Sequence, residues 1–300
     1  MQRFRQVKAN ISRKIPGLLL RGCRRSFLFF IMCLCLAQAL ANNNPEKDLP
    51  FAPGEQLSFD IHFHWGIIMA KAGSAFYSVS SEDVLDLKSA YCSTLSFRTS
   101  AAFDKIFKMR DTLYSYVNAH IEPVYHKKYL HEGNTNYVEE LAFVQFGEKK
   151  TEARSIRYNA DGNVRFEKTL KASTVAFDML NIFMFTRMLD FDNLTVGETI
   201  PLSAFIGRDN IKLQIKYAGQ VILEKNDSQK YKALKFEVDV IDDAFTTSKK
   251  ALEIWIGDDS NRYPLRIRAK LKIGTVEANL SSFSGNKYPH SSLIQIKPHN

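Results

Sequence analysis

The chain has 300 residues, of which 45% are hydrophobic and 12% are aromatic, and it contains four cysteines. This composition excludes an intrinsically disordered chain, and the length excludes a small disulfide-stapled domain. The formal net charge is +9, but residues 1–41 hold eight basic residues and no acidic one. The remaining 33 basic and 32 acidic residues nearly cancel, so we expect no nucleic-acid partner.

Residues 1–41 have the pattern of a secretory signal peptide, with a basic stretch, an apolar run at 27–36 and small residues at 37–41. The apolar run is shorter than the roughly 20 residues of a membrane-spanning helix. Cleavage after Ala41, or after Ala39, therefore predicts a periplasmic protein whose mature chain has no transmembrane span. An uncleaved anchor is the alternative, and association with the outer membrane stays open.

Cleavage removes three of the four cysteines and leaves only Cys92, so the exported chain can form no internal disulfide. Residues 42–50 form a polar leader. No linker-like segment follows in the sequence. Residues 51–300 are therefore expected to form a single antiparallel β domain that is stable through its hydrophobic core.

Apolar and polar residues alternate with a period of two along this domain, which predicts strands with one buried face. Turn-forming residues at 159–163 and 257–261 separate neighbouring strands. The clearest alternating segments are 57–65, 211–217, 234–240, 252–256, 265–273 and 276–280. The sequence thus predicts an all-β, mainly antiparallel fold of about a dozen strands.

The segment 175–189 interrupts this pattern, because eleven of its fifteen residues are apolar. Its length and composition predict an α-helix that begins after Ser173 or Thr174, with Asp178 near its N-terminus. The helix has no polar face, so it must be enclosed on most sides. A second, shorter helical turn is predicted at 100–107.

The strands and the apolar helix together predict a closed or half-open β-barrel-like sheet with the helix packed against it, and a β-sandwich is the alternative. A barrel can hold a small ligand, here an apolar or amphipathic envelope molecule such as a lipid or a lipid-linked glycan. Alternatively, the helix only fills the core. The candidate ligand-binding residues are Phe59, Phe63, Trp65, Phe177, Leu180, Phe183 and Met184.

The sequence contains no recognisable catalytic or cofactor-binding motif. His62 and His64 share a strand face near Asp60, but no further histidine or cysteine matches them by spacing. We therefore assign no catalytic residue, no metal and no cofactor. A hydrolase with a dispersed site around 258–262 is the alternative function.

Four basic residues at alternate positions of 266–272 form a row on one strand face. Such a row either binds an anionic partner or is compensated by Glu253 and Glu277 on neighbouring strands. Cross-strand compensation on a solvated face is the simpler interpretation.

Several segments in this order resemble the bacterial envelope family called domain of unknown function 3108. They are 53–59 (PGEQLSF), 72–75 (AGSA), 103–107 (FDKIF), 110–111 (RD), 132–133 (EG), 178–190, 255–259 (WIGDD) and 261–265 (NRYPL). The resemblance covers about residues 51–283 and implies an exported, strand-rich protein of a Gram-negative envelope. The family has no established activity, so it implies no catalytic residue.

If Asp111 and Arg187 are family positions, the resemblance implies that they form a buried structural ion pair, because an unpaired charge in this apolar setting is costly. The leading functional hypothesis is a non-enzymatic protein that binds, transports or assembles an envelope molecule. A structural partner of an outer-membrane protein complex, which would use an exposed strand edge, is the third hypothesis beside the hydrolase.

Overall fold

The computed structural model describes residues 49–82, 91–226, 229–242, 245–271 and 274–294. The predicted signal peptide and almost all of the polar leader lie outside these residues. The first half of the chain forms β1 (Gln56–Trp65), β2 (Ile68–Ser80), β3 (Tyr91–Thr99), α3 (Ala101–Asp104), β4 (Arg110–Val117), β5 (Pro123–Glu132), β6 (Thr135–Gln145), β7 (Thr151–Asn159) and β8 (Val164–Ala172). The second half forms β9 (Ala176–Phe177), α4 (Asn181–Arg187), the 3-10 helix η1 (Phe191–Asn193), β10 (Thr199–Ile206), β11 (Asp209–Asn226), β12 (Gln229–Asp242), β13 (Phe245–Gly257), β14 (Pro264–Lys270), β15 (Thr275–Ser284) and β16 (Leu293–Ile294).

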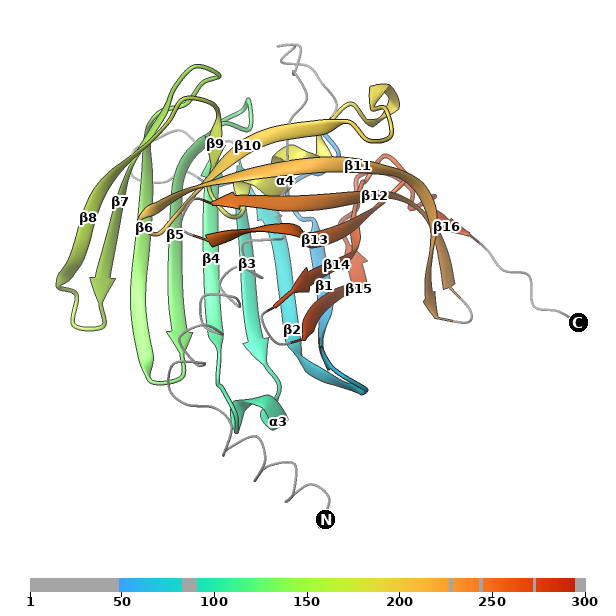
Figure 1. Ribbon diagram of the computed structural model, residues 1–300, viewed down its shortest axis with the longest axis horizontal. Coiled ribbons are helices and arrows are strands. Elements are labelled where there is room, and N and C mark those ends of the chain that lie inside the picture. The colour runs from blue at the N-terminus through green and yellow to red at the C-terminus, as the bar shows by residue number, and fades with distance from the viewer. Residues whose placement is uncertain (1–48, 83–90, 227–228, 243–244, 272–273, 295–300) are drawn as a thin grey trace, which may run out of the picture.

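These strands form one sheet in the order β8-β7-β6-β5-β4-β3-β2-β1-β15-β14-β13-β12-β11-β10-β9, and β16 pairs with β12. Among the described strands, the pairing is antiparallel except between β9 and β10. The sheet curls into a barrel-like shape (Figure 1). Pairing of β1 with β15, for example Ile61 opposite Ala278, joins the two halves of the chain.

The barrel is nearly closed, because side chains bridge its two edges near β8. The Lys168 ammonium donates to the carbonyl oxygen of Arg208 at 2.7 Å, and the Asn210 amide donates to the carbonyl oxygen of Lys171 at 3.1 Å. Backbone pairing between β8 and β11 is absent in the part of the chain that the structure describes. The closed or half-open barrel-like sheet predicted from the sequence is therefore confirmed as a nearly closed barrel, and the alternative sandwich is not formed.

The strands follow the predicted alternation. In β1, Leu57, Phe59 and Ile61 are buried, whereas the intervening Ser58 and Asp60 are half-buried on the other face. Buried residues of β1–β4, α4 and β10–β15 join into one hydrophobic cluster inside the barrel. Within the described residues, no helix has both the length and the apolar character needed to cross a membrane.

The apolar helix is shorter than the predicted segment 175–189. Ala176 and Phe177 form β9 and pair with β10, so the chain is extended where a helix was expected. The Asp178 carboxylate then accepts hydrogen bonds from the backbone N–H groups of Leu180 and Asn181, each at 2.8 Å. These two bonds fix where α4 starts. The enclosure of the helix is confirmed, as is a short helical turn within 100–107, which forms α3.

Gly73 of β2 lies where the register between β1 and β2 shifts. A Cβ atom at this position would lie 2.2 Å from the carbonyl oxygen of Arg98 in β3, and a backbone atom in a paired strand cannot move away cheaply. Gly73→Ala is therefore expected to lower the free energy of unfolding by about 1–3 kcal/mol, as measured by urea denaturation. Gly147→Ala is the control, because its nearest atom would be 3.6 Å away. Equal losses for the two variants would contradict the steric explanation.

Candidate functional site

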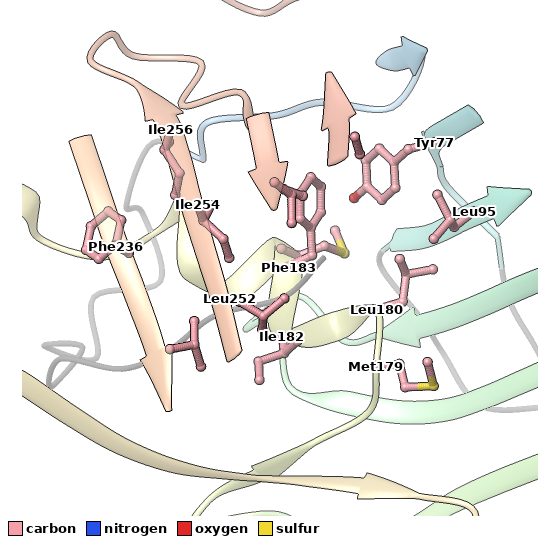
Figure 2. Packing of buried hydrophobic residues seen from close by; sticks show 14 of the residues in the cluster. Tyr77, Leu95, Met179, Leu180, Ile182, Phe183, Phe236, Leu252, Ile254 and Ile256 are labelled. Carbon is pink, nitrogen blue, oxygen red and sulfur yellow. The ribbon is translucent and has the colours of Figure 1, made fainter. Parts of the chain in front are cut away.

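The predicted ligand-binding residues of α4 and its approach are packed into the core. Phe177, Leu180, Phe183 and Met184 are all buried. Figure 2 shows the Phe183 side chain directed toward Tyr77, and the two ring centroids are 4.7 Å apart. The pocket that borders Phe183 has a volume of about 10 Å³, the space of a single water molecule. Among the described residues these side chains pack into the interior, and the pocket that Phe183 lines is too small for a lipid.

The three predicted aromatic residues of β1 lie in different surroundings. Phe59 is buried in the core. Phe63 is half-buried and contacts the ring of Phe103 edge-on, with centroids 6.3 Å apart. Trp65 is exposed at the end of the strand. They therefore do not combine into one binding surface.

Arg187 is fully buried at the end of α4, and its ion-pair partner is Glu55 instead of the predicted Asp111. Nη1 and Nη2 of Arg187 donate to the two carboxylate oxygens of Glu55 at 2.6 and 2.8 Å. The guanidinium also donates to the carbonyl oxygens of Asn261 and Pro50. The predicted pair with Asp111 is wrong, because the guanidinium binds Glu55 and these carbonyl oxygens instead.

Asp111 lies on the inner face of β4, inside the barrel. One carboxylate oxygen accepts the backbone N–H of His131 at 3.1 Å, and the other is buried without a hydrogen-bond partner among the described residues. Burial raises the pKa of Asp111 to about 6, although the nearby Lys128 ammonium acts in the opposite direction.

Further charged residues occupy the inner face of β5–β7. The Lys128 ammonium contacts the Glu139 carboxylate at 2.9 Å, and Arg157 binds the same carboxylate. Burial and the Arg157 charge lower the pKa of Lys128 to about 8. The Asp178 carboxylate lies 3.4 Å from Nδ1 of His126, whose pKa burial lowers. None of these side chains lines the pocket beside Phe183 or the larger pocket described below. Their contacts with one another instead hold the inner wall of the barrel together.

The alternative enzyme site around 258–262 is a tightly bonded turn. One carboxylate oxygen of Asp259 accepts the backbone N–H groups of Asn261 and Arg262 at 3.0 and 3.1 Å, and the other accepts that of Ser292 at 3.0 Å. The Arg262 guanidinium packs over the ring of Phe191 at 4.5 Å. These groups all make structural contacts. The contacts explain why such residues occur in this turn, and no catalytic role is needed to explain them.

A larger pocket, of about 180 Å³, lies where the end of the β11–β12 hairpin and the C-terminal segment approach β14 and β15. Pairing between β14 and β15 stops at Arg266 and Asn279, and β15 continues beyond this point beside β1. The strands thus separate and leave space under the hairpin. The apolar residues that line the pocket are Leu223, Tyr231, Leu265, Leu280, Phe283 and Leu293.

The pocket also contains positive charge and no acidic lining residue. Arg266 is held by the side chain of Asn279 at 2.8 Å, by the carbonyl oxygen of Glu224 at 3.2 Å and by the Glu277 carboxylate at 3.4 Å. Lys225 forms no ion pair with any residue that the structure describes. Burial lowers the pKa of Lys225, although attraction to the Asp60 carboxylate acts in the opposite direction. Sequence reasoning missed this site, because its residues come from five separate strands and the segment between β15 and β16.

The basic row of β14 is largely compensated across strands, which confirms the simpler of the two sequence interpretations. Arg268 contacts the carboxylates of Glu277 at 2.8 Å and Glu253 at 3.5 Å, and Lys235 contacts Glu253 at 2.6 Å. Position 272 lies outside the described residues. Lys225 of the pocket therefore differs from Arg266 and Arg268, which both contact carboxylates.

Comparison with known proteins gives the fold but no activity. No curated protein matches the chain. A β-barrel-like protein of domain of unknown function DUF1849 from Brucella abortus is similar over 79% of this chain and 99% of that chain, with a TM-score of 0.53 and 10% sequence identity. A candidate exported protein with a YmcC-like fold from Bacteroides fragilis aligns over 79% of this chain and 98% of that chain, with a TM-score of 0.31 and 8% identity. The similarity to the Brucella abortus protein supports a shared barrel-like fold.

The family of proteins of unknown function named DUF3108 matches residues 58–281. The match extends from β1 to β15, so it includes the strands that close the barrel and most of the pocket. It confirms the resemblance seen in the sequence, and the chain belongs to the DUF3108 family.

Proposed function

We propose that this protein is a non-enzymatic binding protein of the bacterial cell envelope, and that it holds an anionic amphipathic molecule in the pocket between the β11–β12 hairpin and β14–β15. The observation that carries the proposal is the Lys225 ammonium, which forms no direct ion pair within the described residues and lies in a pocket with a largely apolar lining and no acidic lining residue. A lipid or a lipid-linked glycan with a phosphate group has both required features, an apolar chain and a negative charge.

The cationic side of the pocket suits a phosphate or carboxylate. A partly buried ammonium without an anion is electrostatically costly, and a bound anion removes that cost. The guanidinium of Arg266 is fixed in position by its hydrogen bonds to Asn279 and Glu224, so it is preorganised to donate to the same anion. Together, Lys225 and Arg266 define the polar end of the proposed ligand.

The apolar side suits a hydrocarbon segment. Leu265 and Leu280 are buried in its wall, and Phe283 and Leu293 at its edge are partly exposed to solvent. A bound chain would remove these two side chains from water, which is favourable. The volume of about 180 Å³ is below the roughly 300–1,000 Å³ of sites that enclose a whole drug-sized ligand. The pocket therefore holds only part of a lipid.

The proposal also places the protein in the periplasm. It rests here on the signal-peptide pattern of residues 1–41. In that compartment an anionic amphiphile reaches the pocket from a membrane or from another carrier.

Substitutions at the cationic end should weaken binding. We expect Lys225→Gln and Arg266→Gln each to reduce the affinity for lysophosphatidylglycerol, used below its micelle concentration, by roughly tenfold or more, because a charge-assisted hydrogen bond is lost. Titration monitored by native mass spectrometry measures the affinity. The same method, applied to protein isolated from a periplasm before and after denaturing extraction, should show a co-purifying lipid mass.

The matched control is Lys212→Gln, which removes an exposed lysine from the same strand as Lys225. This variant should bind as the unsubstituted protein does. The proposal is wrong if lysophosphatidylcholine, which has no net charge, binds equally well, or if Lys212→Gln weakens binding as much as Lys225→Gln.

A further inference from the structure

Large apolar side chains are exposed together at one end of the barrel. At the turn between β1 and β2, Trp65 is 46% exposed, Met69 is 66% exposed and Ile67 is completely exposed at 103%. Ile106, in the segment that follows α3, is 61% exposed. Figure 1 shows the β1–β2 turn and α3 at the same end of the barrel. Several large exposed apolar side chains at one end of a folded protein mark an interaction surface.

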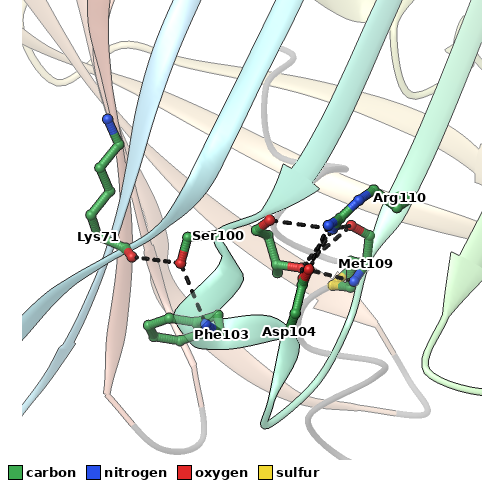
Figure 3. Close-up of polar contacts among 7 residues, drawn as sticks. Lys71, Ser100, Phe103, Asp104, Met109 and Arg110 are labelled. Carbon is green, nitrogen blue, oxygen red and sulfur yellow. Dashed lines mark hydrogen bonds and ion pairs between the residues drawn. The ribbon is translucent and has the colours of Figure 1, made fainter.

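Side-chain contacts hold the β1–β2 hairpin and the α3 segment together. The Ser100 hydroxyl donates to the carbonyl oxygen of Lys71 in β2 at 3.2 Å and accepts the backbone N–H of Phe103 at 3.4 Å (Figure 3). The Phe103 ring meets Phe63 of β1 edge-on. The Lys71 ammonium is bound by Asp60 at 2.6 Å. The two segments therefore present their exposed side chains as one supported surface.

This end also carries uncompensated positive charge. The Asp104 carboxylate of α3 is bound by Arg110 at 2.6 Å (Figure 3). Lys105 and Lys108, on either side of Ile106, are exposed, and neither forms an ion pair within the described part of the chain. Apolar side chains thus lie beside cations whose charge is free to meet an anion.

We propose that this end of the barrel, made by Trp65, Ile67, Met69 and residues 105–108, docks on the surface of a bilayer that contains anionic lipids. Tryptophan is preferred at the level of the lipid headgroups, and aliphatic side chains next to it enter the acyl boundary. Lysines at the same depth attract anionic phosphates. The composition and the arrangement of this end fit that interface.

A lipid surface fits this end better than a protein partner does. The exposed side chains belong to a hairpin turn and a short helical segment, which are convex features, and neither pocket described above includes them. Protein–protein interfaces are depleted in lysine, whereas Lys105 and Lys108 are exposed beside the apolar side chains of this end. The inference is independent of the proposed pocket, which involves none of these residues.

Vesicle flotation tests the proposal with the protein as isolated from the cell. We expect it to float with vesicles of phosphatidylethanolamine and phosphatidylglycerol, and much less with vesicles of phosphatidylcholine. The chain has two tryptophans, and Trp255 is buried, so quenching by lipids brominated on their acyl chains reports on Trp65. Bound protein should show quenched tryptophan emission.

Variants separate the apolar and the electrostatic contributions. The double variant Ile67→Ser, Met69→Ser should reduce vesicle binding by roughly tenfold or more, because two apolar side chains are removed. Lys105→Gln and Lys108→Gln should each reduce binding to the anionic vesicles by about fivefold. The matched control is Val144→Ser, which removes a side chain that is 72% exposed near the end of β6. This control should bind as the unsubstituted protein does.

Three results would overturn the proposal: absence of binding to both kinds of vesicle, binding without quenching of tryptophan, or an equal loss in the Val144→Ser control. Absence of vesicle binding would leave a protein partner as the occupant of this surface. The pocket variant Lys225→Gln should leave vesicle binding unchanged, so failure of membrane docking and failure of the proposed pocket are distinguishable.

Discussion

Replacing Arg187 by methionine is expected to lower the free energy of unfolding by about 3–5 kcal/mol, the usual cost of breaking a buried ion pair by removing one partner. The substitution leaves the Glu55 carboxylate buried without a counter-charge. It also removes the donors that satisfy the carbonyl oxygens of Pro50 and Asn261. Urea denaturation at neutral pH, monitored by circular dichroism, measures the loss.

An exposed ion pair of the same length provides the control. The ammonium of Lys71 and the carboxylate of Asp60 are also 2.6 Å apart, but the Lys71 side chain is 55% exposed and the Asp60 side chain 37% exposed. Lys71→Met should therefore cost less than about 1 kcal/mol. If Arg187→Met is too unstable to isolate, Glu55→Gln removes one charge with little change in shape and should still cost more than Lys71→Met. If the buried and the exposed variants lost similar free energies of unfolding, burial of the Arg187–Glu55 pair would not explain its contribution to stability.

The barrel was predictable because strand alternation is a local property. Leu57, Phe59 and Ile61 face the core at the positions that the pattern assigns to them. The apolar segment 175–189 was correctly expected to be enclosed, but its first residues pair with β10. An unbroken apolar run does not distinguish a buried strand from a buried helix, and the carboxylate of Asp178 decided where the helix starts.

The site was not predictable, because alternation gives the face of a side chain and not its neighbours in space. Arg187 and Glu55 are 132 residues apart in the sequence, and only the tertiary fold, which packs the end of α4 against the start of β1, brings them together. Lys225 and Arg266 meet for the same reason. A charged residue has the same period-two spacing whether its side chain faces the interior or the solvent. The sequence pattern alone therefore does not show that charged residues such as Lys128 point inward.

Asp111→Asn is expected to stabilise the protein at neutral pH by about 2–3 kcal/mol, since a pKa displacement of one unit corresponds to about 1.4 kcal/mol. Burial raises the pKa of Asp111 from 3.8 to about 6, so the charged form is unfavourable in the folded state. Asparagine keeps an oxygen that can accept the N–H of His131. Lys128 keeps its ion pair with Glu139, so the variant leaves no bare ammonium.

The pH dependence follows from the direction of this shift. Between about pH 4 and 6 the folded protein holds a proton on Asp111 that the unfolded chain has released, so its stability falls as the pH rises through this window. The advantage of Asp111→Asn should accordingly be small near pH 4 and reach its full size above pH 6. Asp104 provides the opposite case, because the Arg110 guanidinium lowers its pKa, and Asp104→Asn should destabilise the protein at neutral pH. An Asp111→Asn variant that is less stable than the unsubstituted protein at pH 7 would show that the Asp111 charge is stabilising where it lies, through its attraction to Lys128.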